Sequence, residues 1–492
     1  MLECKEEIVY NKRQVLVSSK SIIKGGIIML TLVKNGKIVS AEDIFEADLL
    51  IRDGKVAEIG LDLEKTLSAD EEADVIDAKG KYVLPGGIDV HTHMDLQAGP
   101  CRAVDDFYDG TVAAACGGTT SIVDHMAFGP VGCPLHHQLN EYHGLAKDKA
   151  VIDYGFHGTA QHPITPEIID ELETMMDDGV PSVKVYMTYD LKCDDNEIVD
   201  ILKKMKELGG ITAFHCENHA LVESNKKRLI AEGKTTPVYH AKSRPNLVEA
   251  EAVRRVLYLA KMAGDAPVYI VHLSCKESLQ AVEEARREGQ KNIFVETCTQ
   301  YLTLTEECYE REDGLKFIMS PPLRTQADID YLWEGMANGQ IQTVATDHCP
   351  FFFNKEKQNG KDDFTKCPNG APGVEERMSL IYSEGVAKGH ISLNKFVETA
   401  CTNPAKIYGL YPKKGVLLPG SDADLIIIDP DKKRVLTHAD MHSAVDYTSY
   451  EGIEVEGVID LVMQRGNVIC KDNVFTGEKG AGEFIFRKPT VF

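Results

Sequence analysis

Long apolar runs are missing from this sequence. It has no stretch of about 18 consecutive apolar residues, which is the length that a membrane-spanning helix needs, so no such helix is expected. It also has no Cys-x-x-Cys pair, although 13 cysteines are scattered from Cys4 to Cys470. An odd number of unpatterned cysteines in so long a chain indicates reduced thiols rather than a disulfide framework, which favours a cytoplasmic protein.

Basic residues are scarce relative to acidic ones. The 492 residues include 54 lysines and arginines against 77 aspartates and glutamates, which gives a formal net charge of -23. Such an acidic surface repels phosphate backbones and anionic lipid headgroups, so we expect neither a nucleic acid nor a membrane as partner. The apolar content of 43% is that of an ordinary globular protein with a large core.

The first 28 residues differ from the rest. They show no clear periodicity, and Lys24 and Gly25-Gly26 interrupt their apolar pieces, so they do not form a convincing signal peptide. The stretch KGGIIM can be encoded by a bacterial ribosome-binding sequence followed by a start codon at Met29. We therefore hypothesise that translation begins at Met29 and that residues 1–28 are not part of the native protein. A disordered arm is the alternative.

Both ends of the remaining chain are typical of short strands and turns. Residues 29–84 include TLVKNGKIVS and ADLLIRDGKVAEIG, in which Asn-Gly and Asp-Gly turns separate β-rich runs. Residues 411–470 have the same style, as in GVLLPGSDADLIIIDP, and residues 471–492 form a mixed apolar and basic tail. We infer that the two ends meet in one small β-sandwich domain, with the middle of the chain inserted between them.

The middle of the chain, residues 85–410, alternates strand-like and helix-like segments. PEIIDELETMMDDG and NEIVDILKKMKELGG have apolar residues at helical spacing and a glycine just past the end. Eight candidate strands alternate with such helices: GGIDVHTH, TTSIVDH, VIDYGFHG, PSVKVYMTY, ITAFHCEN, PVYIVHLS, NIFVETCTQYL and TVATDHCPF. This pattern predicts an α/β fold with a closed (β/α)8 TIM-like barrel. A doubly wound open sheet is the alternative, but no glycine-rich phosphate loop follows any strand.

Two histidines stand one residue apart at the end of the first candidate strand. In GGIDVHTHMDL, His91 and His93 occupy positions i and i+2, whose side chains point to the same face of a strand. Two imidazoles side by side are well placed to hold one metal ion. For this segment alone, a pair of surface histidines is the alternative.

Further residues of ligand type lie in later candidate strands. His215 closes the fifth strand, His272 the sixth and Asp347 the eighth. In a (β/α)8 barrel these carboxyl ends converge on one face, where catalytic residues lie. Imidazoles and a carboxylate suit zinc, and iron or manganese would be tolerated. Lys184 lies inside the fourth, apolar strand, where an isolated charge is costly. It either snorkels or pairs with an acid, or it has reacted with CO2 to give an anionic carbamate that can bridge two metal ions.

Other histidines and one cysteine lie near these positions. We expect supporting or structural roles for four of the histidines: His125, His157, His162 and His348. Three more fall in a helical stretch and are expected at the surface: His136, His137 and His143. Cys349 stands two residues after Asp347, but the sequence places no base for it, so a nucleophilic cysteine is disfavoured.

Eight segments carry a resemblance to a known family. They are LPGGIDVHTHMDL, VKVYMTYDLK, FHCENH, YIVHLSC, VETCTQYL, FIMSPPLR, VATDHCPF and CPNGAPGVEERM. Together they are highly specific, whereas any one alone would be moderately so. From about Met29 to its end, the chain resembles the cyclic amidohydrolases of the D-hydantoinase and dihydropyrimidinase family, and most of all their D-phenylhydantoinase type.

The resemblance implies a metal-dependent hydrolase that opens the cyclic amide or imide ring of 5-substituted, preferentially aryl-substituted hydantoins to N-carbamoyl amino acids. It implies that His91, His93 and Asp347 hold one divalent ion, most readily zinc, and that His215 and His272 hold a second. Lys184, as N6-carboxylysine, and a hydroxide would bridge the two ions.

The resemblance also implies roles for residues other than the metal ligands. The Tyr189 hydroxyl would donate a hydrogen bond to the developing oxyanion, and backbone groups of Ser320 and Asn369 would bind the amide edge of the ring. Asp347 would take a proton from the attacking hydroxide and deliver it to the leaving ring nitrogen. A homotetramer is implied as well, with the C-terminal tail packing on a neighbour.

Two segments depart from the family pattern and leave alternatives open. The loop MDLQAGPCRAVDDF replaces a glycine-rich stretch, which bears on substrate size and stereochemistry, and Thr299 stands where proline is common. Dihydropyrimidinase activity on dihydrouracil or dihydrothymine is the main alternative. Dihydroorotase-like chains usually place an arginine soon after the His-x-His pair to bind a substrate carboxylate. The first arginine here is Arg102, so a dihydroorotase is disfavoured. A metal-free, non-enzymatic relative is a distant alternative, because all six ligand positions are present.

Overall fold

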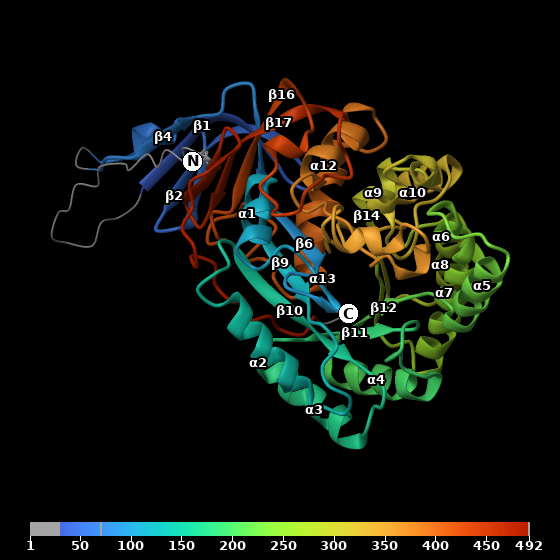
Figure 1. Cartoon of the computed structure of the whole chain (residues 1–492). Coiled ribbons are helices and arrows are strands. Elements are labelled where there is room, and N and C mark those ends of the chain that lie inside the picture. Colours follow the sequence, from blue (N-terminus) through green and yellow to red (C-terminus); the bar gives the residue numbers. More distant parts are fainter. Residues whose placement is uncertain (1–29, 69–70, 491–492) are drawn as a thin grey trace, which may run out of the picture.

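The chain folds into a barrel and a separate sheet that lie side by side (Figure 1). The computed structural model describes residues 30–68 and 71–490, so the predicted extension 1–28 lies outside the described residues. Within the described ranges, no helix has the length and apolar character that crossing a membrane requires.

Eight parallel strands form the barrel, which confirms the predicted (β/α)8 fold over an open doubly wound sheet. In chain order they are β6 (Gly87–Thr92), β9 (Thr119–His125), β10 (Asp153–Ala160), β11 (Ser182–Tyr186), β12 (Ile211–His215), β13 (Val268–Ile270), β14 (Ile293–Cys298) and β15 (Thr343–Ala345). A bridge between Thr92 and His348 joins the ends of the first and last strands. Nearly all strand residues are buried, as expected for a parallel sheet that helices cover.

Helices surround the barrel (Figure 1). They are α1 (Asp109–Cys116), α2 (Leu135–Ala146), α3 (Pro166–Asp177), α4 (Asp195–Leu208), α5 (His219–Ala231), α6 (Val238–Ser243), α7 (Asn246–Met262), α8 (Lys276–Arg287), α9 (Thr299–Thr303), α10 (Gln326–Ala337), α11 (Arg377–Leu380), α12 (Leu393–Val397) and α13 (Asn403–Ile407). The two helices predicted from apolar spacing are α3 and α4. Asp194 and Glu197 form a capping box that begins α4, and Gly209 ends it in a left-handed conformation that glycine adopts without strain.

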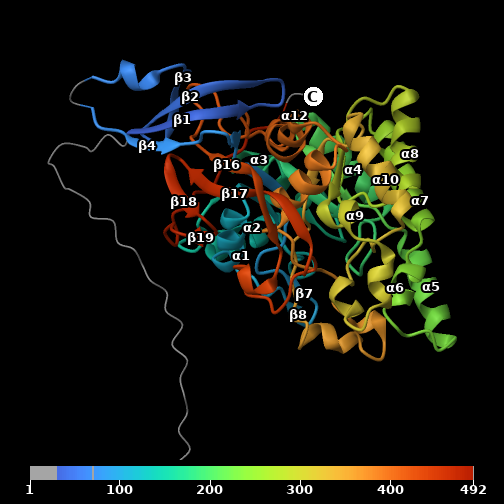
Figure 2. The same ribbon diagram turned by 90° about the horizontal axis from the view of Figure 1, so that it is seen from above.

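The two ends of the chain meet in one separate unit, as predicted, and this unit is a nine-stranded mixed sheet (Figure 2). The amino-terminal part provides β1 (Leu30–Val39), β2 (Ile44–Arg52), β3 (Lys55–Gly60), β4 (Asp74–Asp77) and β5 (Tyr82–Pro85), and the carboxyl-terminal part provides β16 (Leu425–Val435), β17 (Glu454–Gln464), β18 (Asn467–Lys471) and β19 (Val474–Phe475). The two parts meet where β5 pairs antiparallel with β16. Because β5 leads directly into β6, this pairing fixes the sheet beside the first barrel strand.

One segment predicted as a strand is partly helical. NIFVETCTQYL begins as β14, but the strand ends at Cys298 and the short helix α9 follows. In that helix Gln300 and Tyr301 donate side-chain hydrogen bonds to the backbone carbonyls of Thr346 and Pro321, at 2.9 and 2.7 Å. These tertiary contacts outweigh the β propensity of the segment.

The C-terminal tail docks on the barrel of its own chain. The Tyr154 amide donates to the Glu483 carbonyl at 3.0 Å, and the Ile485 amide donates to the Tyr154 carbonyl at 2.7 Å. Arg487 is fully buried and donates to Ser182 Oγ at 3.0 Å. The described tail is therefore anchored beside β10 of its own chain, and additional packing on a neighbour stays a prediction.

Candidate active site

One cavity, with a volume of about 750 Å³, gathers every residue predicted for the site. The nine predicted residues, all among those that line it, are His91, His93, Lys184, Tyr189, His215, His272, Ser320, Asp347 and Asn369. They are far apart in the sequence and meet because the parallel strands of a barrel end on one face.

Two imidazoles converge on one carboxylate. The Oδ1 atom of Asp347 lies 3.1 Å from His91 Nε2 and 3.0 Å from His93 Nε2. Burial alone would raise the pKa of Asp347, but the two imidazoles hold it well below its usual value. Asp347 is therefore anionic, and the i, i+2 spacing of His91 at the end of β6 and His93 just after it brings both imidazoles to the same carboxylate.

A second pair of imidazoles comes from β12 and from the segment after β13. The Nε2 atom of His272 lies 2.9 Å from Nδ1 of His215, whose other nitrogen, Nε2, contacts Glu217 Oε2 at 2.8 Å. Burial opposes the ionisation of Glu217, but Arg244 holds the pKa of Glu217 well below its usual value. Because an ionised carboxylate only accepts hydrogen bonds, the proton of neutral His215 resides on Nε2 and its Nδ1 lone pair faces His272.

Lys184 is buried without a carboxylate partner. It is 1% exposed, and in the described part of the chain no acidic group forms an ion pair with it. Its Nζ atom lies 3.5 Å from His91 Nε2. Burial lowers the pKa of Lys184 to about 8, although Asp347 and Glu296 act in the opposite direction. A substantial fraction of this amine is therefore neutral near pH 8, which is the form that reacts with CO2.

Two buried carboxylates support the site and are missing from the sequence-based prediction. Glu296 on β14 lies with Oε1 2.6 Å from His91 Nδ1, and the same oxygen accepts the His272 amide at 2.9 Å. Glu217 contacts His215 in the same supporting manner. Both could have been found by one signal, an acidic residue within or just after a buried strand, because such a charge needs partners.

Three cavity residues have left-handed backbone conformations. Their φ angles are 73° at Tyr189, 37° at His272 and 56° at Asp347. Residues held in such regions cost about 1–3 kcal/mol each and cluster at functional sites. The surrounding structure stabilises them; for example, the Asp347 amide donates to the His91 carbonyl at 2.9 Å.

The residues predicted to bind substrate also lie at the cavity. Burial raises the pKa of Tyr189 to about 12, so its hydroxyl stays protonated and can donate a hydrogen bond. Asn369 is followed by Gly370, where a Cβ atom would lie 2.3 Å from the Cys349 carbonyl oxygen. Only glycine therefore lets this loop approach the segment that carries Asp347.

The supporting histidines divide between the barrel interior and the surface. His125 and His157 are fully buried with ring centroids 4.2 Å apart, and the His125 ring lies 4.3 Å from that of His91. His348 is buried and contacts Asp105 at 2.8 Å. These three therefore form part of the packing beneath the site.

His162 and the histidines of α2 do not line the cavity, whereas Cys349 does. His162 is exposed and pairs with Glu197, and three histidines lie on the partly exposed helix α2: His136, His137 and His143. Burial raises the pKa of Cys349 well above its usual value, so it stays a thiol rather than a nucleophilic thiolate.

The donor set fits a metal centre. His91, His272 and Asp347 offer ligand atoms that lie within 4.8 Å of one another. The buried Nδ1 of His93 has no hydrogen-bond partner among the described residues. Imidazole and carboxylate donors in this arrangement suit zinc, and also iron or manganese.

Comparison with known proteins gives consistent matches along the chain. The sequence model of the Amidohydrolase family matches residues 82–469. A D-phenylhydantoinase from Escherichia coli O1:K1 / APEC is 49% identical over 463 residues, which cover 94% of this chain and 99% of that protein.

Solved structures show the same likeness in three dimensions. The dihydropyrimidinase from Brevibacillus agri NCHU1002 has a TM-score of 0.91 at 43% identity, covering 94% of this chain and 99% of that one. The L-hydantoinase (dihydropyrimidinase) from Arthrobacter aurescens has a TM-score of 0.84 at 32% identity, covering 93% and 99%. The likeness thus spans nearly the whole of each relative.

Proposed function

Because the chain belongs to the amidohydrolase family, whose members depend on metal, we propose that it opens the ring of 5-substituted hydantoins, preferentially aryl-substituted ones, to N-carbamoyl amino acids. The family match confirms the resemblance and the enzyme class predicted from the motifs, a cyclic amidohydrolase. The observation that carries the proposal is that the histidines and Asp347 converge in one cavity around Lys184, which has no acidic partner among the described residues.

We infer that the cavity holds two divalent ions, most readily zinc. His91, His93 and Asp347 would hold one, and His215 and His272 the other, with carboxylated Lys184 shared between them. When bound, the ions would lower the pKa of water to about 7 and polarise the scissile carbonyl. The carbamate accounts for a lysine that is buried without an acidic partner.

The residues of the chain then carry out proton transfer and orientation. Asp347 accepts a proton from the attacking water as the new C–O bond forms, and passes it to the ring nitrogen as the C–N bond breaks. The protonated hydroxyl of Tyr189 donates to the carbonyl oxygen, where negative charge develops. Backbone groups of Ser320 and Asn369 hold the amide edge of the ring.

Dihydropyrimidinase activity is the second candidate, favoured by the TM-score of 0.91 to the Brevibacillus agri enzyme. Hydantoins and dihydropyrimidines present similar amide geometry, so the same residues would serve either ring. We expect the loop of residues 94–106 to contact the exocyclic group, since Leu96, Ala98 and Cys101 from that loop line the cavity.

The test is to produce the full chain with zinc and bicarbonate, and to measure bound metal together with hydrolysis of phenylhydantoin and of dihydrouracil. Lys184→Ala should lose turnover of both rings, whereas Lys204→Ala, which removes the surface contact with Glu173, should retain it. Label from ¹³C-bicarbonate should appear in the parent and not in Lys184→Ala. Folded, metal-free parent protein without turnover of either ring would overturn the proposal.

We also infer a cytoplasmic homotetramer, from the family resemblance and the pattern of free cysteines. Light scattering of the purified chain tests the assembly, and a monomer at micromolar concentration would contradict it.

A further inference from the structure

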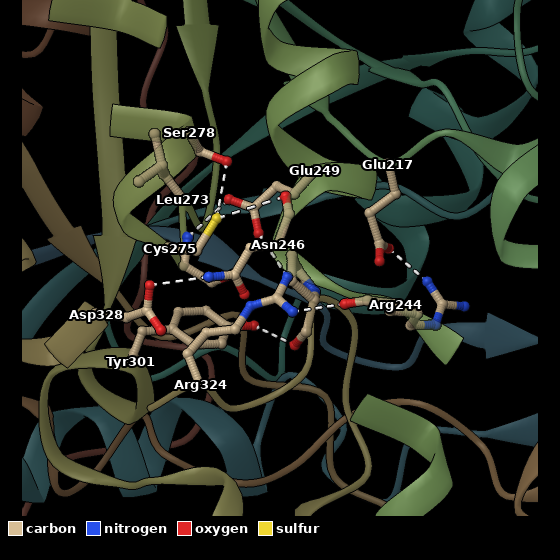
Figure 3. Close-up of polar contacts among 12 residues, drawn as sticks. Glu217, Arg244, Asn246, Glu249, Leu273, Cys275, Ser278, Tyr301, Arg324 and Asp328 are labelled. Carbon is tan, nitrogen blue, oxygen red and sulfur yellow. Dashed lines mark hydrogen bonds and ion pairs between the residues drawn. The ribbon is translucent and has the colours of Figure 1, made fainter. Parts of the chain in front are cut away.

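Two buried ion pairs are linked into one network (Figure 3), and one of its members, Arg244, lines the cavity. The charged members of the network are Glu217, Arg244, Glu249 and Arg324, and none is more than 4% exposed. Two guanidinium groups balance two carboxylates, so these four side chains together carry no net charge. Charged side chains are rarely buried without such pairing, and each member therefore depends on the others.

The first ion pair of the network, between Arg244 and Glu217, acts on one predicted metal ligand. Arg244 Nη1 lies 2.5 Å from Glu217 Oε2, the same oxygen that contacts His215 Nε2 at 2.8 Å. Arg244 therefore holds the carboxylate that orients the His215 ring. Carboxylates on the outer nitrogen of a ligating histidine are a common arrangement, and their mutation costs about 10–100-fold in metal affinity or activity.

The second ion pair, between Arg324 and Glu249, contacts the segment that carries another predicted ligand. Arg324 uses all three of its nitrogens: Nη1 donates to the Arg244 carbonyl at 2.5 Å, Nη2 pairs with Glu249 Oε2 at 2.9 Å, and Nε donates to Ser274 Oγ at 2.9 Å. Glu249 Oε1 accepts the Ser274 amide at 2.9 Å. Ser274 stands two residues after His272. A lysine cannot reproduce this planar three-way contact.

The network of ion pairs connects segments that the barrel itself leaves separate. Glu217 follows β12, Arg244 lies between α6 and α7, Ser274 follows β13, and Arg324 precedes α10. We propose that Arg244 and Arg324 are positioning residues that keep His215 and His272 at the spacing that one metal ion requires. This inference rests on the proposed function, because it takes these histidines as metal ligands.

The experiment compares metal retention in Arg324→Lys and Glu217→Gln with the parent. Arg324→Lys keeps the positive charge but loses the planar guanidinium with its three donor nitrogens. Glu217→Gln keeps the shape of the side chain but loses its negative charge. Zinc per subunit is measured at rising chelator concentration, and the melting temperature of the metal-free protein is measured by circular dichroism. Both variants should lose one ion at a chelator concentration about 10–100-fold lower than the parent and retain the other ion as the parent does.

A matched control is Arg255→Gln on α7, which removes a partly exposed pair with Asp195 at 2.9 Å. It should retain both ions like the parent. Variants that hold two ions as firmly as the parent would overturn the inference and leave the proposed function intact. Equal loss of both ions with a lowered melting temperature would show general destabilisation and also overturn it. A parent that binds no zinc would instead overturn the proposed function itself.

Discussion

A buried lysine ties the sheet to the barrel. Lys414 Nζ lies 2.6 Å from Asp153, 2.9 Å from Asp422 and 2.6 Å from Asp424, and none of the four residues is more than 4% exposed. Asp153 begins β10, whereas the other two aspartates precede β16. The three carboxylates are grouped closely enough to hold a metal ion, but the ammonium of Lys414 pairs with all three.

Lys414→Met removes this charge while keeping most of the side-chain volume. Removing one partner of a buried ion pair costs about 3–5 kcal/mol. Asp422 keeps its contact with Lys413, and Asp153 keeps Arg465 at 3.3 Å, so we expect the lower end, about 3 kcal/mol. At about 2.1 cal/mol/K per residue, the chain unfolds with an entropy of about 1 kcal/mol/K, so Tm should fall by about 3 °C.

The loss should depend on pH. Burial opposes the ionisation of Asp422, but Lys414 and its neighbours hold the pKa of this carboxyl well below its usual value. A depressed folded-state pKa contributes stability above the unfolded value, near pH 4, and that stability is lost as pH falls through the folded value. Without Lys414 the carboxylates repel one another and bind protons more readily. Relative to the parent, the Lys414→Met variant should therefore lose more stability at pH 8 than at pH 5.

Thermal unfolding by circular dichroism at pH 8 and pH 5 measures this effect. Lys413→Met is the matched control, because Lys413 contacts the same Asp422 but its side chain is 50% exposed. Such surface pairs contribute about 0–1 kcal/mol, so its Tm should fall by about 1 °C or less. Equal Tm values for the two variants, or a larger loss at pH 5 than at pH 8, would refute the reasoning.

Two further variants test the site itself. Tyr189→Phe should lower kcat for phenylhydantoin by about 10²–10³ with zinc content unchanged, because one oxyanion donor is lost; a rate within about threefold of the parent would contradict this. Because burial raises the pKa of Tyr189 to about 12, ionisation of Tyr189 should not reduce the activity of the parent below about pH 11. Glu296→Gln should weaken zinc binding about 10–100-fold in a chelator titration, because His91 Nδ1 loses its charged partner, and an unchanged affinity would argue against that role.

The barrel and the residues at its mouth could be predicted because both follow from local rules. The i, i+2 spacing of His91 and His93 requires only that the chain stays extended from the strand 87–92 into the next residue. The convergence of His215, His272 and Asp347 requires only that all the strands are parallel and end on one face. These rules hold whatever the loops do, so the candidate ligands came together as expected.

Contacts between loops could not be predicted in this way. Arg244 and Arg324 are 80 residues apart and meet only after α6, α7 and α10 have packed, so no pattern in the sequence pairs them. The left-handed conformation of Tyr189 also depends on surrounding structure, since nothing in the residue type favours it. The turn of NIFVETCTQYL into α9 has the same cause, contacts made by Gln300 and Tyr301.

Charge balance gives an independent argument for carboxylation of Lys184. Glu217 is neutralised by Arg244, and Asp89 lies 3.7 Å from Arg377, which leaves Asp347 and Glu296 as the two carboxylates in contact with the His91 ring. Lys184 as an ammonium would cancel one of them and leave a single negative charge to meet the four positive charges of two divalent ions. As a carbamate, Lys184 would raise the number of negative charges to three. Since unbalanced charge is costly in a buried cavity, we expect that, if the two proposed ions bind, carboxylation of Lys184 accompanies their binding.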